Sequence, residues 1–576
     1  MKLYTVWGEK LDKNNPLSEY PRPQLVRDSY FNLNGQWNYR ISQTAQGEGY
    51  DGTITVPFSP ECLLSGVGRV LMPEETLVYN RTFNLPEGFI KDKTFLHFGA
   101  VDYICKVTLN GVDVGGHRGG YTPFSLDVSS AVREGENTVT VSVTDPSDTG
   151  VQSRGKQKLN AGTGIWYTPQ SGIWQTVWLE SVNADYVHKV RFTPDIDNGR
   201  VCIEIFAGNY SEKAFTVIKL KDKTVFESET PVNEPFFADI PDQQLWSPEN
   251  PVLYDVFVTI GEDTVMSYFG MRKFSQGRDK DGNFRLMLNN EPYFYNGLLD
   301  QGYWSDGMYT PPSDEAMIYD IELAKKLGFN MLRKHIKIEP LRWYYHCDRL
   351  GMICWQDMIN GGGQYKFSRI ATLPFLGLGC DDSQYAKFAR EDKAGRDEYY
   401  RDLADMIDTL YNSVCISLWT IFNEAWGQFD SKKVYEFVRS LDCTRTVDPA
   451  SGWYDQKGMD IKSVHKYFVK YRYKKDSFRP LALSEFGGYS IQVKDHVFTD
   501  KIFGYKVFRD KDKFMKAFGK LYLGQIVPAM KKGLAACVYT QLSDVESEIN
   551  GLVTYDRKVV KVDPVKTAEI CKLLKL

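Results

Sequence analysis

The sequence predicts a multidomain protein of β and α/β structure, in which two β-sandwiches precede a C-terminal TIM barrel of eight strands and eight helices. Residues 1–276 contain short runs of alternating apolar and polar residues separated by turn signals, which is the pattern of antiparallel sheets. From residue 277 onward, short apolar runs alternate with segments of helical spacing, as in a parallel sheet covered by helices. A chain of 576 residues has room for about three domains.

Residues 1–183 are expected to form a jelly-roll sandwich. Alternating runs at residues 103–109 and 138–143 are separated by turns, of which Asn110-Gly111 is the strongest hairpin signal. Residues 184–276 alternate again at residues 201–206 and 254–260. About ninety residues with this pattern predict an immunoglobulin-like sandwich.

Residues 277–576 are expected to form the barrel. Candidate strands lie at residues 293–295, 331–333, 352–355, 416–419, 446–447, 463–465, 481–483 and 535–539. The clearest helix has Ser313 as its cap, acidic Asp314 and Glu315 in its first turn, and Gly328 at its end. Eight such units in about 300 residues predict a TIM barrel, with a long loop at residues 360–397 at the rim of the cleft.

Composition and motifs exclude several classes of function. The net charge of -4 arises from interspersed charges, so a nucleic-acid partner is not expected. The ten cysteines include no C-x-x-C pair, and the sequence has no H-E-x-x-H, Walker or G-x-S-x-G motif, so we expect no metal site and no required cofactor. The N-terminus lacks the apolar core of a signal peptide and no apolar run is long enough for a membrane span, which favours the cytoplasm and no membrane partner.

Two buried strands end on a glutamate. The apolar run that starts at Cys415 ends on Asn423-Glu424, and the run from Leu481 ends on Glu485 before two glycines. A carboxylate at the end of a buried strand is costly unless it is paired or functional, and the carboxyl ends of barrel strands are where sites are built. As the ends of the fourth and seventh expected strands, the two glutamates would share one mouth of the barrel. Paired carboxylates there indicate cleavage of a glycosidic bond.

Several segments carry a resemblance to a known family. Residues 99–103, 109–111, 115–124 and 171–179 resemble the N-terminal sugar-binding domain of glycoside hydrolase family 2, which includes β-galactosidases, β-glucuronidases and β-mannosidases. The Trp-Ser-Pro phrase at residues 246–254 matches the family's immunoglobulin-like domain, and residues 412–424 resemble a signature of its barrel. The resemblance implies an exo-acting, retaining β-glycosidase with a two-carboxylate, double-displacement mechanism and a carbohydrate substrate.

The resemblance also implies roles for individual residues. Glu424 would be the acid/base and Glu485 the nucleophile. Asn423 is expected either to bind the sugar 2-hydroxyl or to be a satisfied strand-end amide, while Tyr467 would donate to the nucleophile. Four further residues at strand ends are expected either to bind glycone hydroxyls and orient the pair or to form structural ion pairs: Arg333, His335, Asp300 and Asp357. The chain departs from the family at Ile336-Lys337, where Tyr-Pro is usual, which leaves the substrate preference open.

The sequence near the eighth strand bears on the sugar. Family members that cleave glucuronides carry an Asn-x-Lys pair there, whereas this chain has Glu548-Ile549-Asn550. A glutamate would repel a sugar carboxylate, so we expect a neutral glycone, with β-galactoside first. A β-glucuronidase, β-mannosidase or arabinosidase of the same family, or a catalytically silent carbohydrate-binding protein, is the alternative. A structural or assisting cation and homo-oligomerisation stay open.

Overall fold

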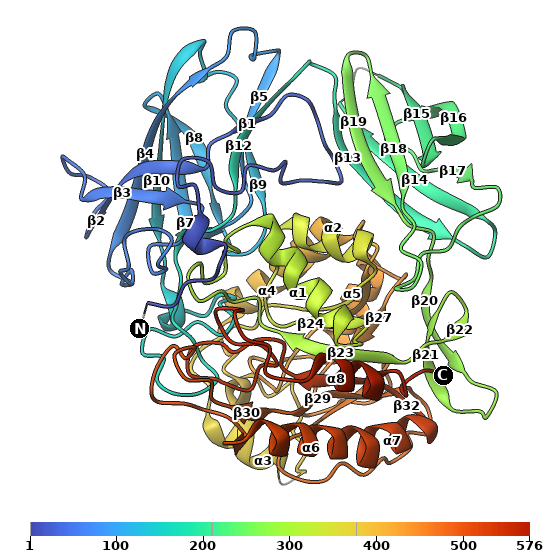
Figure 1. Cartoon of the computed structure of the whole chain (residues 1–576). Coiled ribbons are helices and arrows are strands. Elements are labelled where there is room, and N and C mark those ends of the chain that lie inside the picture. Colours follow the sequence, from blue (N-terminus) through green and yellow to red (C-terminus); the bar gives the residue numbers. More distant parts are fainter. Residues whose placement is uncertain (1, 209–210, 376) are drawn as a thin grey trace.

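Two sandwiches sit side by side along one side of a barrel (Figure 1). The computed structural model describes residues 2–208, 211–375 and 377–576. The last strand of the first sandwich ends at Val182 and the second sandwich begins at Val187. The jelly-roll, immunoglobulin-like and barrel architecture expected from the sequence is confirmed.

The first sandwich has two main antiparallel sheets and a short pair of strands, β6 (Val101–Asp102) with β11 (Gly172–Ile173). The larger sheet has the order β3 (Gly52–Val56), β2 (Gly35–Ser42), β4 (Thr76–Leu85), β10 (Gly135–Thr144), β7 (Ile104–Leu109) and β8 (Val112–Arg118). The smaller sheet has the order β1 (Phe31–Asn32), β12 (Val177–Val182), β5 (Lys93–Phe98) and β9 (Phe124–Asp127). Asn110 and Gly111 both adopt positive φ (53° and 80°) between β7 and β8, as the expected two-residue hairpin turn requires.

The second sandwich has a three-stranded and a four-stranded sheet. The first contains β13 (Val187–Asp195), β14 (Arg200–Ala207) and β17 (Phe236–Asp239). The second contains β16 (Lys223–Pro231), β15 (Lys213–Leu220), β18 (Tyr254–Ile260) and β19 (Asp263–Phe269). Alternate residues of β18 are buried, as the sequence pattern predicts for a strand with one face in the core.

Eight parallel strands form the barrel. Their order is β27 (Thr446–Asp448), β26 (Ile416–Thr420), β25 (Ile353–Asp357), β24 (Met331–Lys334), β23 (Tyr295–Asp300), β32 (Leu534–Thr540), β29 (Leu481–Gly487) and β28 (Lys462–Lys466). All eight expected strands are present, but β23 was expected at residues 293–295 and runs to Asp300. Gly297 does not break it, because the missing side chain leaves room for Met331, whose sulfur would lie 2.5 Å from a Cβ there.

The barrel has a seam between β27 and β28. Within the described ranges these two end strands of the sheet share no backbone ladder. Side chains bridge them instead: Ser463 Oγ donates to Asp448 Oδ2, and the Val447 N–H donates to Asp460 Oδ2 at 3.0 Å. The seam is therefore held by a few polar contacts.

Helices cover the outside of the barrel. They are α1 (Asp314–Lys326), α2 (Leu341–Leu350), α4 (Lys393–Leu410), α5 (Ser431–Leu441), α6 (Lys511–Leu521), α7 (Val527–Lys531) and α8 (Pro564–Cys571). The Ser313 side chain caps α1 by accepting from the Ala316 N–H, as expected. The expected loop at 360–397 is interrupted by helical turns at 368–375 and 385–388, and it ends early because Asp392 caps α4. No helix of the described ranges has the length and apolarity needed to cross a bilayer.

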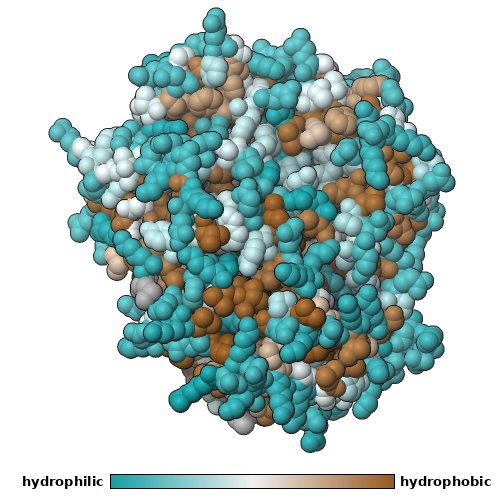
Figure 2. All heavy atoms as spheres, viewed as in Figure 1, coloured by the Kyte–Doolittle hydropathy of each residue, from teal (hydrophilic) through white to brown (hydrophobic). Residues whose placement is uncertain are grey.

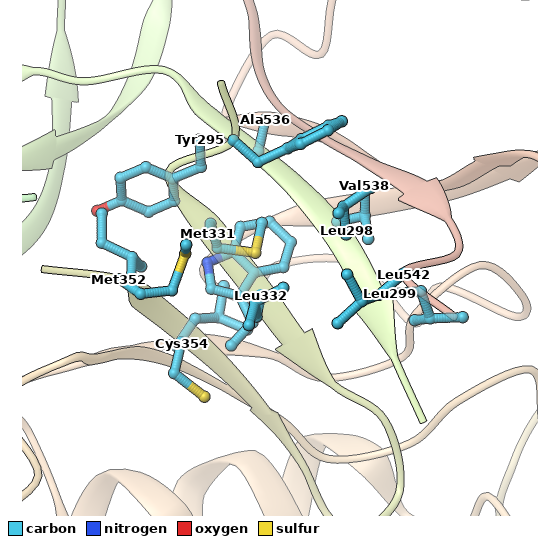
Figure 3. Packing of buried hydrophobic residues seen from close by; sticks show 14 of the residues in the cluster. Tyr295, Leu298, Leu299, Met331, Leu332, Met352, Cys354, Ala536, Val538 and Leu542 are labelled. Atoms are coloured by element: carbon cyan, nitrogen blue, oxygen red, sulfur yellow. The ribbon is translucent and has the colours of Figure 1, made fainter. Parts of the chain in front are cut away.

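Both faces of the barrel strands are closely packed. Leu298, Leu332 and Val538 are fully buried, and Figure 3 shows them in the cluster of apolar side chains around β23, β24 and β32. Polar residues cover most of the face seen in Figure 2, apart from a group of apolar residues near its centre. The packed interior leaves the carboxyl ends of the strands as the place for a site.

One segment of the first sandwich reaches the mouth of the barrel. We call residues 150–170 the strap. The Arg154 N–H donates to the Asn360 carbonyl at 3.0 Å, the Gly164 N–H to Ser547 Oγ at 3.1 Å, and the Thr168 N–H to Glu546 Oε1 at 2.9 Å. The barrel mouth is therefore walled on one side by another domain.

Candidate active site

A strained turn presents Glu424. The chain leaves β26 at Thr420, and Glu424 and Ala425 then adopt φ of 48° and 64°. Side chains other than glycine rarely adopt this left-handed conformation, and it concentrates at functional sites. The Glu424 N–H donates to the Ser451 carbonyl at 3.0 Å, which fixes the turn beside the end of β27.

Glu485 lies within β29 and faces Glu424. Oxygen atoms of the two carboxylates and a ring nitrogen of His465 all lie within 4.8 Å of one another. The Glu424 side chain is 13% exposed and that of Glu485 is 6% exposed. The two carboxylates that the sequence placed at one mouth are thus brought together, with Glu424 the more accessible.

Two side chains hold the Glu485 carboxylate. Arg333 Nη1 donates to Oε1 at 3.1 Å, and the Tyr467 hydroxyl donates to Oε2. Burial and the nearby Glu485 charge raise the pKa of Tyr467 well above its usual value, so the phenol remains a donor. Tyr467 also lies 3.0 Å from Thr540 Oγ1, and its ring stacks on Tyr505. Both oxygens of Glu485 are therefore held in place by hydrogen-bond donors.

Arg333 connects Glu485 to two other predicted site residues. Its guanidinium donates to both oxygens of Asp357, at 2.9 and 3.0 Å, and to Asn423 Oδ1 at 2.7 Å. The side chain is fully buried, and although burial opposes protonation, the Asp357 and Glu485 charges raise its pKa. Arg333 and Asp357 thus orient other groups of the site.

His465 contacts the other glutamate. Its Nδ1 is 2.7 Å from Glu424 Oε1, and its Nε2 is 3.2 Å from Ser451 Oγ. Gly452 allows this packing, since a Cβ there would lie 2.6 Å from the imidazole. His465 was not named as a site residue from the sequence, although the same strand-end rule that found the glutamates applies to it.

Asn423 and His335 offer polar atoms to a ligand. Within the described part of the chain, the buried Asn423 Nδ2 has no hydrogen-bond acceptor. His335 Nδ1 lies 2.8 Å from Asp357 Oδ2, which orients the ring. Burial and the Lys156 charge lower the pKa of His335 to about 4, so its imidazole is neutral near pH 7.

Asp300 lies in a different network. It pairs in register with Lys334, whose Nζ donates to Asp300 Oδ2 at 2.7 Å and lies 4.2 Å from the Trp343 ring centre in α2. Successive residues of a strand face opposite sides, so Lys334 points to the helices while Arg333 points to the interior. Of the two readings given for Asp300, the contacts are those of a structural ion pair.

Further groups at the mouth come from loops. Trp426 follows Glu424 by two residues, and the strap contributes Lys156 and Tyr167. The Tyr167 hydroxyl donates to Glu548 Oε2, and the Lys156 Nζ lies 5.5 Å from the Trp426 ring centre. None of the three lies at the end of a barrel strand, so the sequence pattern does not identify them. The positions of Lys156 and Tyr167 depend on how the strap packs against the barrel.

Three models of one family match the chain in order. Its sugar binding domain matches residues 66–181, a second model named for the family matches 185–272, and its TIM barrel domain matches 283–486. The chain belongs to glycosyl hydrolase family 2.

Relatives within family 2 differ in the sugar that their names state. A β-galactosidase of Thermoanaerobacter pseudethanolicus is 25% identical over 422 residues, which cover 68% of this chain and 50% of that protein. The chain spans half or less of the length of this relative and of two further β-galactosidases that it matches.

Solved structures share the family 2 fold. A β-D-glucuronidase of Dictyoglomus thermophilum has a TM-score of 0.75 at 17% identity, covering 96% of this chain and 98% of that one. A β-galacturonidase of Eisenbergiella tayi, bound to galacturonate, has a TM-score of 0.70 at 18% identity, covering 96% and 99%. At these identities the likeness establishes the fold.

Among the described residues, Glu424, His465 and Glu485 form a group whose ligand atoms are close enough to hold a cation. One ligand atom from each lies within 4.8 Å of the others. The same closeness is required of a retaining carboxylate pair, about 5–5.5 Å between carboxyl groups, so it does not by itself indicate a metal.

Proposed function

We propose that this chain is a retaining, exo-acting β-glycosidase, with Glu485 as nucleophile and Glu424 as acid/base. One observation carries the proposal: one oxygen of each carboxylate lies within 4.8 Å of the other, which fits the close carboxyl pair of a retaining enzyme. An inverting enzyme needs about 6.5–9.5 Å between its carboxyl groups to admit a water molecule.

The contacts of each glutamate support its role. Glu485 receives hydrogen bonds on both oxygens, which favour an ionised nucleophile ready to attack the anomeric carbon. Glu424 is the more exposed and can protonate the departing glycosidic oxygen, then take a proton from the water that attacks the glycosyl-enzyme. Asn423 Nδ2 can donate to the sugar 2-hydroxyl, a contact that strengthens in the transition state. The strap and the residues after β32 close one side of the site, which favours cleavage of a terminal sugar.

We further propose a neutral glycone, with β-galactoside first. Glu548 is 1% exposed and interacts electrostatically with Glu485 across the site. A sugar carboxylate would have to approach this group and both catalytic glutamates, which is unfavourable at low dielectric. A β-uronide is the second candidate, because the buried Lys156 ammonium lies near the same carboxylates and would attract an anion.

Two substitutions test the mechanism. Glu485→Gln should abolish turnover. Glu424→Ala should spare substrates with a 2,4-dinitrophenyl leaving group, which needs no proton, and azide should restore its activity. The first product, followed by NMR in the wild-type protein, should keep the β configuration. An inverted first product would contradict the retaining assignment.

A panel of nitrophenyl β-glycosides tests the substrate. Galactoside, mannoside, glucoside, arabinoside, glucuronide and galacturonide are compared by kcat/KM at one pH. We expect the galactoside to be cleaved best. Preferential cleavage of a uronide would refute the neutral glycone, and no cleavage of any member would favour a silent carbohydrate-binding protein.

A further inference from the structure

Lys156 brings a cation from the first sandwich into the barrel mouth. Its side chain is only 5% exposed and lies between two aromatic rings, with Nζ 5.4 Å from the centre of Tyr167 and 5.5 Å from that of Trp426. Gly155 sets the direction of the strap here, since it has φ +65° and a Cβ would meet the Tyr121 hydroxyl at 2.9 Å.

The contacts of this ammonium are the two rings. In residues 2–208, 211–375 and 377–576, no ion pair with a carboxylate and no hydrogen bond is found for Lys156 Nζ beside them. Burial lowers its pKa, and the charges of Glu548, Glu485 and Glu424 oppose that shift. The ring faces attract the cation but accept no strong hydrogen bond, so its N–H donors remain available to a ligand.

Tyr167 links Lys156 to Glu548. Lys156 Nζ lies 5.4 Å from the centre of the Tyr167 ring, and the hydroxyl of the same ring donates to Glu548 Oε2. The Asn550 amide donates to the other Glu548 oxygen, so the carboxylate is held in place while lone pairs remain to accept. The strap and the loop after β32 therefore place a donor and an acceptor near each other without an ion pair between them.

We infer that a hydroxyl of the glycone bridges Lys156 and Glu548, accepting from the ammonium and donating to the carboxylate. A hydroxyl can do both at once, whereas a sugar carboxylate could accept from Lys156 but would face Glu548 as a like charge. The inference rests on the proposed function and names the residues that select a neutral sugar. It makes Lys156 a specificity-determining residue supplied by a domain that holds neither catalytic glutamate.

The test combines a substitution with modified substrates. Lys156→Met removes the charge and keeps the length of the side chain, and Lys158→Met, two residues along the strap, is the matched control. We expect Lys156→Met to lower kcat/KM for the preferred neutral glycoside by about 10- to 100-fold and the control to change it little. Thermal melting of the free protein should stay level or rise for Lys156→Met, because an unpaired buried charge has been removed.

Deoxy glycosides that each lack one ring hydroxyl identify the contact. At the bridging position, deoxygenation should lower kcat/KM in the wild-type protein but have little effect in Lys156→Met. At the other positions, the loss of kcat/KM from deoxygenation should be the same in both proteins. Multiplicative losses at every position would overturn the inference. So would unfolding of Lys156→Met, which would give the ammonium a structural role.

Two results separate this inference from the proposed function. If the wild-type protein is active, Glu485→Gln is inert and Lys156→Met behaves like the control, the inference alone fails. If the wild-type protein prefers a uronide and Lys156→Met removes that preference, Lys156 binds a carboxylate and the bridging hydroxyl is refuted. Absence of turnover of every glycoside by the wild-type protein refutes both.

Discussion

Tyr467→Phe isolates one hydrogen bond to the proposed nucleophile. The phenol donates to Glu485 Oε2, and its ring stacks on Tyr505 with centroids 4.0 Å apart, so phenylalanine keeps the packing and loses the donor. A hydrogen bond to a charged group contributes about 1.5–3 kcal/mol. At about 1.4 kcal/mol per factor of ten, formation of the glycosyl-enzyme should slow by about 10- to 150-fold. Since burial raises the pKa of Tyr467, the phenol stays protonated and the ratio should hold from about pH 5 to 9.

The assay measures covalent trapping directly. A 2,4-dinitrophenyl 2-deoxy-2-fluoro glycoside releases dinitrophenolate as the glycosyl-enzyme forms, and the burst rate is compared between variants. Tyr471→Phe is the control, because the Tyr471 hydroxyl has no partner in the described ranges. An unchanged burst rate in Tyr467→Phe, with a melting temperature like that of the control, would refute the role assigned to this tyrosine.

Three further outcomes are expected. Arg333→Met should lower the free energy of unfolding by about 3–5 kcal/mol in urea denaturation, because it leaves two buried carboxylates unpaired; a loss below about 1 kcal/mol would contradict this. Burial raises the pKa of the Glu180 carboxyl, but Arg22, His97 and Arg27 outweigh burial and hold the pKa at about 2. The ionised carboxylate therefore stabilises the folded protein above the unfolded pKa of about 4.3, and this contribution is lost as the pH falls through about 2. Wild type and Glu180→Gln should accordingly converge in free energy of unfolding over that pH range. Finally, dialysis against EDTA should leave glycosidase turnover intact, since the two-carboxylate route needs no metal, and a loss restored by added metal would show otherwise.

The sequence was informative wherever a local rule determines position. Burial on both faces followed by a polar end located Glu424 and Glu485, because the ends of parallel strands converge on one mouth whatever the loops do. The register between β23 and β24 pairs Asp300 with Lys334 and so places it on the other face of the sheet from Arg333, but register is not visible in the sequence, which expected this strand to end at residue 295. For Asp300, as for Arg333, His335 and Asp357, the sequence left sugar contact and ion pairing both open.

The position of Lys156 at the barrel mouth could not be predicted from the sequence. It lies in a loop of the first sandwich, more than 250 residues before either glutamate, and no period or motif marks it. Its place depends on the strap docking on the barrel through backbone contacts such as Arg154 to Asn360. Glu548 was singled out from the sequence for its repulsion of an anion, whereas the cation near it becomes apparent only in the structure.

The seam of the barrel lies between the two glutamates. In the order of strands, β29 and β28 stand on one side of it and β27 and β26 on the other, so Glu485 and Glu424 face each other across the gap that lacks a ladder. Around the rest of the sheet, strand number and shear determine the diameter of the barrel. Between β27 and β28 a few side-chain contacts, such as Ser463 with Asp448, determine the distance between the strands. A bulkier residue at Ser463 would push the two rims apart without touching either carboxylate. Widening by about 2 Å would admit a water molecule between the two carboxylates. Whether an enzyme of this design retains or inverts the anomeric configuration would then depend on how tightly the barrel closes between β27 and β28.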